Sequence, residues 1–293
     1  MATKQQYTIQ FRNTEYEPED IVAGIGRVAG LGVMAIFYAF PLYWMASRSV
    51  MTNLQAFKLP PVWIPTEPTL SAYQSILLQG PYASFLLNSA TVTVLSVTLA
   101  LVLSVPATYG LVVSDFPYNL NRHFSLFLIS LFMLPPIVTS ISYFNLLQDL
   151  GLYDRAIGLG FIYTMFNIPL IVWFTRGFIA DIPDSLRESA LLDGANEFQV
   201  FYRIYLPLIR PGIAAAAIIS YIITWNEYLL ALILTSNRAK TMPVGINQFV
   251  GQYNITWNEL SAGIVLVVLP SVLFLTVTQR YIVSGLVRGA VKE

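Results

Sequence analysis

A charged stretch of the sequence, DIPDSLRESALLDGANEFQVFYRIYLPLIRPG at residues 181–212, lies between two long apolar runs. Ser185 and Glu188 have the S-x-x-E spacing of a capping box, which predicts the start of a short helix. Gly194 is typical of a helix end, and a second short helix is expected from about Asn196. The stretch therefore predicts two short helices joined at a glycine, in a loop that connects one apolar run to the next.

Six runs of the sequence are apolar and long enough to cross a bilayer, which takes about 20 helical residues. Charged residues make up 11% of the chain and hydrophobic residues 56%, whereas soluble domains carry about 25% charged residues. This composition is typical of an integral membrane protein. We expect an all-α fold with six transmembrane helices, over residues 28–47, 86–113, 124–147, 156–175, 211–235 and 262–280.

These runs divide the chain into three parts. Residues 1–27 form an N-terminal segment, residues 28–280 a six-span membrane domain, and residues 281–293 a C-terminal tail. If the N-terminus is cytoplasmic, eleven Lys and Arg residues fall on the cytoplasmic side and five on the other side. This bias predicts that both termini are cytoplasmic, together with the loop at residues 181–205.

Small residues and prolines recur inside the predicted spans. Small side chains at helical spacing favour close packing of one helix on another, and a proline inside a helix removes a hydrogen bond and bends it. The second span carries a small-residue stripe at Ser89, Thr93, Ser96, Ala100 and Ser104. The first span has Gly26 and Gly30 in GxxxG spacing, and the prolines are Pro41, Pro106, Pro135, Pro136, Pro169 and Pro270.

The residue types present argue against several classes of function. The chain has no cysteine and one histidine, His123, so neither a cysteine nucleophile nor a Cys- or His-based metal site is expected. Basic and acidic residues cancel, which argues against nucleic-acid binding. No Gly-x-x-x-x-Gly-Lys phosphate loop and no paired nucleophile and base occur. We therefore expect a chain that is not an enzyme and binds no cofactor itself.

The charged stretch resembles the cytoplasmic signature of permease subunits of ABC importers. That signature reads E-A-A, three residues, G, nine residues, then I-x-L-P. The chain matches it at Glu188, Ala190, Gly194, Ile204, Leu206 and Pro207, and has Ser189 where the signature has alanine. The resemblance implies that a short helix of this loop docks on the ATP-binding subunit. The residues it assigns to ATPase coupling are Glu188, Ser189, Ala190, Asp193, Gly194 and Ala195.

Three further segments, Trp225–Tyr228, Met242–Gly245 and the tail at residues 279–292, resemble sugar-importer permeases, and more narrowly the maltose-type second permease subunit. The resemblance implies a type I ABC importer permease in the bacterial inner membrane. Its implied partners are a second permease subunit that forms a heterodimer with this chain, two ATP-binding subunits that carry ATP and Mg, and an extracytoplasmic solute-binding protein. The tail resembles the part of the family that contacts the ATPase.

Glu227 is the one acidic residue well inside a predicted span, where a buried carboxylate costs at least ~2.5 kcal/mol. It should therefore face a cavity or a partner. Ser220 and Thr224 share its predicted helix face, with Asn226 on the flank, so this stripe can exchange hydrogen bonds with sugar hydroxyls. Two alternatives stay open: water at the outer interface solvates Glu227, or its carboxylate pairs with a helix end. The other candidates for the substrate path are Asn167, Trp225 and Tyr228.

The identity of the solute stays open at this point. An ABC permease for a non-sugar solute shares the signature at residues 188–207. An ion-coupled secondary transporter usually carries charged residues inside several helices, and only Glu227 qualifies here. The function favoured by the sequence is the transmembrane subunit of an ATP-driven importer that moves a di- or oligosaccharide by alternating access.

Overall fold

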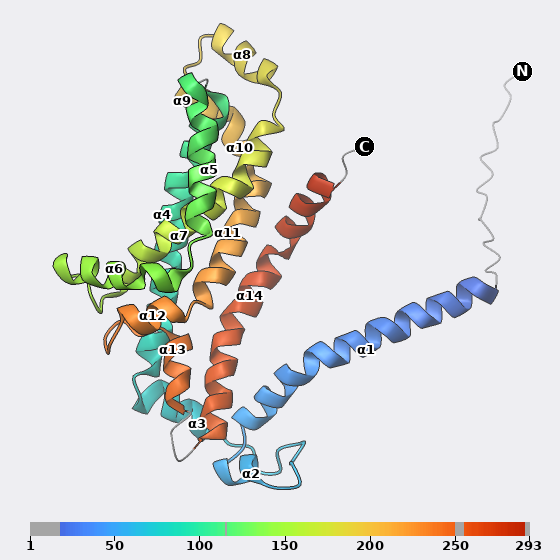
Figure 1. Ribbon diagram of the computed structural model, residues 1–293. Helices are drawn as coiled ribbons and strands as arrows, with labels where there is room; N and C mark the ends of the chain where they lie inside the picture. The colour runs from blue at the N-terminus through green and yellow to red at the C-terminus, as the bar shows by residue number, and fades with distance from the viewer. Residues whose placement is uncertain (1–17, 115, 250–254, 291–293) are drawn as a thin grey trace, which may run out of the picture.

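The computed structural model describes residues 18–114, 116–249 and 255–290, and its regular structure in these ranges is helical (Figure 1). The helices are α1 (Pro18–Ser49), α2 (Asn53–Phe57), α3 (Ser71–Gln74), α4 (Tyr82–Val113), α5 (Leu120–Phe132), α6 (Pro136–Asp149), α7 (Ala156–Ala180), α8 (Asp184–Leu192), α9 (Glu197–Val200), α10 (Leu206–Leu208), α11 (Arg210–Trp225), α12 (Leu229–Leu234), α13 (Met242–Ile246) and α14 (Trp257–Ala290). A π-helical turn, Phe201–Tyr205, joins α9 to α10.

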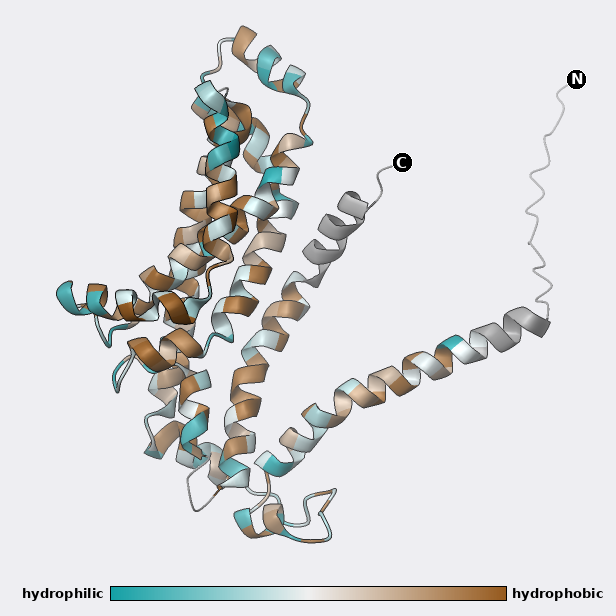
Figure 2. Ribbon diagram, in the orientation of Figure 1, coloured by the Kyte–Doolittle hydropathy of each residue, from teal (hydrophilic) through white to brown (hydrophobic). Residues whose placement is uncertain are grey.

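Four of the described helices, α1, α4, α7 and α14, are long and apolar enough to cross a membrane. Two bent pairs raise this number to as many as six: Pro117–Phe132 with Pro136–Asp149, and Glu197–Leu208 with Arg210–Trp225. The long helices carry hydrophobic residues along their length, whereas α8 is largely hydrophilic (Figure 2). The six apolar runs predicted from the sequence thus correspond to the larger count, in which each bent pair is one span. The prediction of an all-α membrane fold is confirmed.

Two of the predicted spans are not continuous helices. In the span predicted at residues 124–147, the helix axis turns by 93° between α5 and α6. Pro135 is extended and Pro136 starts α6, which fits the preference of proline for the first position of a helix. The span predicted at residues 211–235 is also broken, because α11 ends at Trp225 and α12 begins only at Leu229.

The pairing of α4 with α7 forms the centre of the bundle (Figure 1). The predicted stripe of small residues on α4 is buried along its length, which confirms its packing role. Thr175 donates a hydrogen bond to Thr108 across this interface, with 3.2 Å between the two oxygens. A β-carbon on Gly160 would lie 2.7 Å from the Leu95 side chain, so the helices approach more closely than alanine would allow.

Helix α1 diverges from the bundle (Figure 1). Its most apolar window, within Gly26–Ser49, is 0% buried inside the chain. A β-carbon on Gly26 or Gly30 would meet no atom within 4 Å, so the described chain offers no packing partner for the GxxxG pair. The helix is fixed at its C-terminal end, where Tyr43 and the next turn reach the loop after α2.

The last helix is longer than its predicted span of residues 262–280. Its backbone remains helical to Ala290, so most of the predicted tail at residues 281–293 continues α14. Residues 1–17 of the predicted N-terminal segment and residues 291–293 of the tail lie outside the described residues. The predicted contact of the tail with an ATPase stays a prediction.

The two ends of the bundle are distinct (Figure 1). Helices α8 and α9 lie at one end, and α2 and α3 lie at the other. The predicted cytoplasmic loop at residues 181–205 and the predicted external loop at residues 48–85 are therefore at opposite ends. This arrangement agrees with the predicted topology, in which these two loops lie on opposite sides of the membrane. Which end faces the cytoplasm stays a prediction.

Asp154, in the turn between α6 and α7, holds the segment that follows α12. Its two carboxylate oxygens accept hydrogen bonds from the backbone N–H groups of the four residues 236–239, over distances of 2.9 to 3.2 Å. Burial alone would raise the pKa of this carboxyl, but the four N–H groups outweigh it, and the pKa is lowered. The segment at residues 236–239 is therefore anchored to a charged Asp154.

Replacing Asp154 with Asn should release this segment, because an amide offers one acceptor oxygen and no charge. Hydrogen bonds to charged groups contribute ~1.5–3 kcal/mol each, so amide hydrogen exchange at residues 236–239 should accelerate at least about tenfold. In the wild type, the stabilisation by the charged Asp154 carboxylate is complete above the pKa of an unfolded Asp, about 3.9. It is lost as the pH falls through the lower pKa that Asp154 has in the folded protein. Asp149→Asn, at an exposed carboxylate, is the matched control. Unchanged exchange in Asp154→Asn would contradict the anchoring role.

Candidate functional site

The charged stretch folds as predicted into two short helices joined at a glycine. Helix α8 has nine residues, and Gly194 after it has a φ of +87°, which favours glycine. The predicted capping box is wrong, because no side chain caps α8, whose first residue follows Pro183. The box forms instead at α9, where Asn196 and Gln199 exchange side-chain and backbone hydrogen bonds of 2.9 and 3.0 Å.

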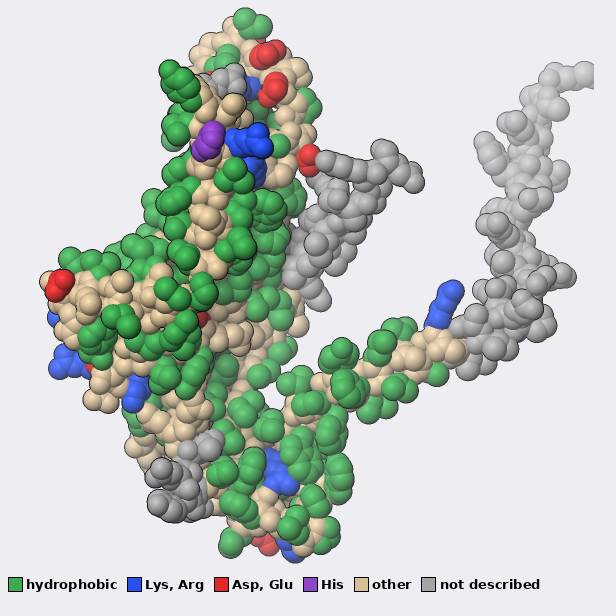
Figure 3. Space-filling view, in the orientation of Figure 1, with side chains coloured by type: hydrophobic (Ala, Val, Ile, Leu, Met, Phe, Trp, Pro, Cys, Tyr) green, Lys and Arg blue, Asp and Glu red, His purple; other side chains and the backbone are tan. Residues whose placement is uncertain are grey.

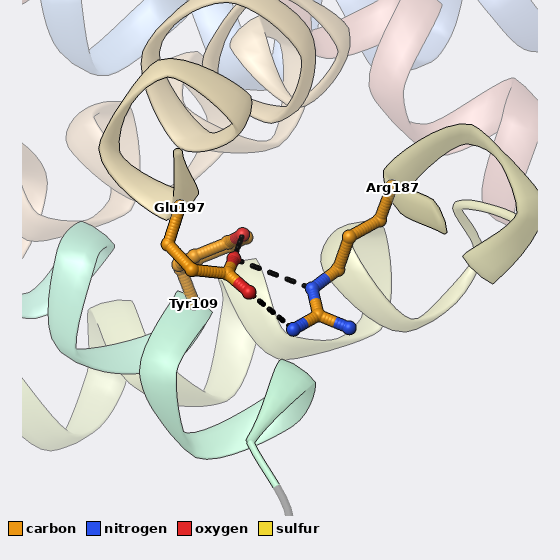
Figure 4. Close-up of polar contacts among 3 residues, drawn as sticks. All are labelled: Tyr109, Arg187 and Glu197. Atoms are coloured by element: carbon orange, nitrogen blue, oxygen red, sulfur yellow. Dashed lines mark hydrogen bonds and ion pairs between the residues drawn. The ribbon is translucent and has the colours of Figure 1, made fainter. Parts of the chain in front are cut away.

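Arg187, Glu197 and Tyr109 join α8, α9 and α4 through one carboxylate (Figure 4). Arg187 forms an ion pair with Glu197 and donates a second hydrogen bond from Nε at 3.3 Å. The Tyr109 hydroxyl, near the end of α4, donates to the same carboxylate at 2.7 Å. The Glu197 carboxylate also raises the pKa of Arg187, which keeps the guanidinium charged. These contacts join α8 to α4 through Glu197 of α9.

The second half of the signature packs on the spans. Tyr109 contacts the rings of Phe201 and Tyr205 with centroids 5.1 and 4.9 Å apart. Ile204 and Leu206 pack against the same buried cluster, which includes residues of α4 and α7. The I-x-L-P part of the signature therefore forms the base that fixes α8 and α9 to the membrane helices.

The predicted coupling residues fall into two groups in the structure. Glu188, Ser189, Asp193 and Gly194 are exposed at the tip of the loop, where a docked protein can reach them. Charged side chains of both signs gather at this end of the molecule (Figure 3). The other two residues, Ala190 and Ala195, are partly buried and pack inward on the cluster beneath the loop.

Large apolar side chains are also exposed on this loop, which sequence reasoning missed. Leu192, in the last turn of α8, is 89% exposed. The rings of Phe198 and Tyr202 stack side by side, at an interplanar angle of 7°, and both are exposed. Such a patch on a hydrophilic loop is typical of a protein-binding surface.

Some of the predicted substrate-path residues line a cavity of about 240 Å³ between α5, α6, α7 and α11. Asn167, Thr224 and Glu227 line it together with Tyr163 and aromatic and aliphatic side chains. Asn167 donates hydrogen bonds to the Thr224 hydroxyl at 2.9 Å and to the Tyr163 carbonyl at 3.0 Å. The structure therefore brings together three of the seven predicted residues.

The carboxylate of Glu227 pairs with a helix end, which was one of the open alternatives. Its oxygens accept hydrogen bonds from the backbone N–H groups of Leu230 at 2.8 Å and Ala231 at 3.1 Å, the first turn of α12. The buried Tyr163 hydroxyl donates a third hydrogen bond to the carboxylate. Glu227 is half-buried and lies in the break between α11 and α12, so the prediction that it shares a helix with Ser220 is wrong.

The remaining predicted residues lie elsewhere. Ser220 is fully buried and does not line the cavity, and its hydroxyl has no hydrogen-bond partner among the described residues. Trp225 is buried against Tyr221, and its indole N–H donates to the Val267 carbonyl at 3.1 Å. The Tyr228 hydroxyl accepts a hydrogen bond, while the exposed Asn226 donates one to a carbonyl of its own helix. Because the Trp225 ring is buried, it cannot stack on a sugar ring in this structure.

Among the residues that the structure describes, no group of His, Asp and Glu side chains could hold a metal ion. Sequence reasoning missed Tyr163, Tyr109, Arg187 and Glu197 as members of the two sites. Arg187 and Glu197 lie inside the charged stretch with opposite charges, which was a usable signal. The two tyrosines come from distant helices and gave no local signal.

A family described as "Binding-protein-dependent transport system inner membrane component" matches residues 117–288. The trehalose transport system permease protein SugB of Mycobacterium tuberculosis is 33% identical over 270 residues, 90% of this chain and 96% of its own length. The sulfoquinovosyl glycerol transport system permease protein SmoH of Agrobacterium fabrum is 31% identical over 271 residues, 91% of this chain and 93% of its own.

A crystal structure shares the fold. It is that of a bacterial ABC transporter involved in the import of the acidic polysaccharide alginate. The superposition has a TM-score of 0.74 at 24% identity and covers 91% of this chain and 99% of the matched chain.

Proposed function

The chain belongs to the family of binding-protein-dependent transport system inner membrane components, and from this premise we propose that it is the permease subunit of an ABC importer for a sugar. The observation that carries the proposal is the identity with permeases named for trehalose and sulfoquinovosyl glycerol over nine-tenths of the chain. The several apolar helices agree with a multi-pass protein of the cell membrane. It is a transport subunit rather than an enzyme.

The working transporter contains further chains in this proposal. A second permease subunit forms a heterodimer with this chain, two ATP-binding subunits with ATP and Mg drive transport, and an extracytoplasmic solute-binding protein delivers a di- or oligosaccharide. The exposed tip of α8 and the apolar patch at Leu192, Phe198 and Tyr202 support docking of an ATP-binding subunit. The Arg187, Glu197 and Tyr109 contacts support transmission of its movement to α4.

The cavity at Asn167, Thr224 and Glu227 supports a polar path for the solute. Its hydroxyl, amide and carboxylate groups are suited to exchange hydrogen bonds with sugar hydroxyls, each worth ~1 kcal/mol net. In the present arrangement Asn167 bonds to Thr224 and Tyr163 bonds to Glu227, so the path is a gate that is closed until α7 moves away from α11 and from Glu227.

Uptake by reconstituted vesicles tests the proposed function. This chain, its second permease, the ATPase and the binding protein should together concentrate a labelled di- or oligosaccharide in an ATP-dependent manner. Omission of this chain should abolish uptake. Transport of an amino acid or phosphate in place of every sugar tried would contradict the sugar assignment and leave the family membership intact.

The predicted sidedness can be tested with single cysteines, since the chain has none. Ser189, on α8, and Thr66, in the loop after α2, are both exposed and lie at opposite ends of the bundle. A membrane-impermeant maleimide applied to intact cells should label Thr66→Cys and leave Ser189→Cys unlabelled until the cells are opened. The reverse pattern would invert the orientation.

A further inference from the structure

A second cavity, of about 320 Å³, lies where the end of α1 meets the start of α14, far from the site described above. Its lining combines two cations with aromatic rings, namely Arg48 and Lys58 with Trp44, Phe57 and Trp257. Ligand-binding cavities commonly measure ~300–1,000 Å³, so this one is large enough to hold a small ligand group.

Arg48 has an unusual environment. It is 9% exposed, and its buried Nε has no hydrogen-bond partner in the part of the chain that the structure describes. Within the described residues no carboxylate lies within ion-pair distance of it, and the guanidinium instead lies 4.3 Å from the centroid of the Trp44 ring. A buried cation with an unpaired donor is costly unless an anion completes its contacts. The guanidinium therefore calls for an anionic group in this cavity.

The surroundings of Arg48 hold it in place. Tyr43 and Ser47 both donate hydrogen bonds to the Trp63 carbonyl, at 2.8 and 3.1 Å, which fixes the loop after α2 against α1. The Trp44 and Trp63 rings meet edge to face with centroids 5.3 Å apart. A basic side chain among hydrophobic ones is visible where α1 reaches α2 (Figure 3). The cavity is thus a built pocket rather than a chance gap.

The cavity lies at the level of a membrane interface. Arg48 is in the last turn of a candidate span, and Trp257 begins another, whose N-terminal dipole favours an anion. Tryptophans are typical of this depth in membrane proteins. Next to the cavity, α2 and the loop after it expose large apolar side chains at Leu54, Phe57, Leu59, Trp63 and Ile64. A loop of this kind favours contact with lipid.

The geometry points to a binding site for the phosphate of an anionic phospholipid at Arg48 and Lys58. The guanidinium and the ammonium pair with the phosphate, while the aromatic rings cover the glycerol and the upper part of the acyl chains. Such a lipid supplies the missing partner of Arg48 and adds to the contacts that already join α1 to α14.

Native mass spectrometry of the full chain in a neutral detergent tests the site, with phosphatidylglycerol and phosphatidylcholine of identical acyl chains as probes. The wild type should retain phosphatidylglycerol in preference. Arg48→Gln and Lys58→Gln should each reduce its retention about fivefold, the effect of one basic residue near anionic lipid. Lys58 is exposed, so its replacement keeps the test valid if Arg48→Gln folds poorly.

Arg155→Gln, at an exposed cation outside the cavity, is the matched control and should retain phosphatidylglycerol like the wild type. Equal retention of the two lipids, or equal loss in Arg155→Gln and in the cavity variants, would overturn the proposal. A third arm adds inorganic phosphate to the lipid-free chain. Phosphate adducts that disappear in Arg48→Gln would show that the site takes a free anion and would overturn the assignment to a lipid.

Discussion

Gly194→Val is expected to abolish most sugar uptake, because the residue after α8 has a φ of +87° that a β-branched side chain cannot adopt without strain. A strained backbone of this kind costs ~1–3 kcal/mol, so the native position of α8 should lose about tenfold or more of its population. Apart from its two neighbours in sequence, no described residue lies within 4 Å of a β-carbon at this position, so the effect comes from the backbone and not from crowding. The recovery of the ATP-binding subunit in co-purification with this chain measures the loss of docking directly.

A series of substitutions at Gly194 separates backbone strain from other causes of lost uptake. Asn tolerates positive φ better than Ala, and Ala better than Val, so ATPase recovery should fall in the order Gly, Asn, Ala, Val. Gly177→Ala is the matched control, since Gly177 also has open space around it but lies inside α7. Normal uptake together with full ATPase recovery in Gly194→Val would remove the coupling role from this loop.

Glu227→Leu is expected to reduce uptake by a comparable or larger factor. The change leaves two backbone N–H groups of α12 and the Tyr163 hydroxyl without their acceptor. Charge-assisted hydrogen bonds contribute ~1.5–3 kcal/mol each, so the loss of all three should destabilise the closed form of the gate by at least about a thousandfold. Uptake into vesicles is measured beside recovery of both partner types from the same preparation, and recovery should survive.

Two further variants distinguish the two possible roles of this segment, capping of α12 by Glu227 and direct contact with the solute. Tyr163→Phe removes one donor and keeps the cap of α12, so a small loss of uptake is expected if capping is the main role. Asn226→Leu leaves the cap intact and alters the exposed neighbour, so a loss there supports direct contact with the solute. Wild-type uptake by Glu227→Leu and Asn226→Leu together would exclude this break from the substrate path.

Much of the membrane fold could be predicted because its signals are local. Apolar runs of sufficient length and the small-residue stripe of α4 depend on the chemistry of a single helix. Prolines were ambiguous: α4 and α7 remain continuous across Pro106 and Pro169, whereas Pro135 and Pro136 coincide with a 93° turn. Whether a proline breaks a span depends on the packing around it, which one sequence does not encode locally.

The sites were predictable only in part for the same reason. Gly194 could be found because a single residue type suits its backbone. Glu227 stood out as a lone acid, but its partner Tyr163 is 64 positions away, and the break that turns the carboxylate toward α12 has no strong local signal. Tyr109 and Glu197, 88 positions apart, meet only once α4 and the loop are folded together.

Helix α4 connects both ends of this arrangement. Near its C-terminal end Tyr109 bonds to Glu197 of the coupling loop, and near its N-terminal end Asn88 donates to the carbonyls of Arg238 and Lys240 at 2.8 and 3.0 Å. The helix is continuous between these two residues, over about 31 Å at ~1.5 Å per residue.

This geometry makes α4 a lever arm. A tilt of about 5° imposed at Tyr109 on a rod of that length moves Asn88 by about 3 Å. Hydrogen bonds at 2.8 and 3.0 Å do not survive a shift of that size, so the tilt exchanges the contacts of Asn88 rather than stretching them. A tilt of a few degrees at the loop would thus break the contacts of Asn88 at the opposite end of the same helix.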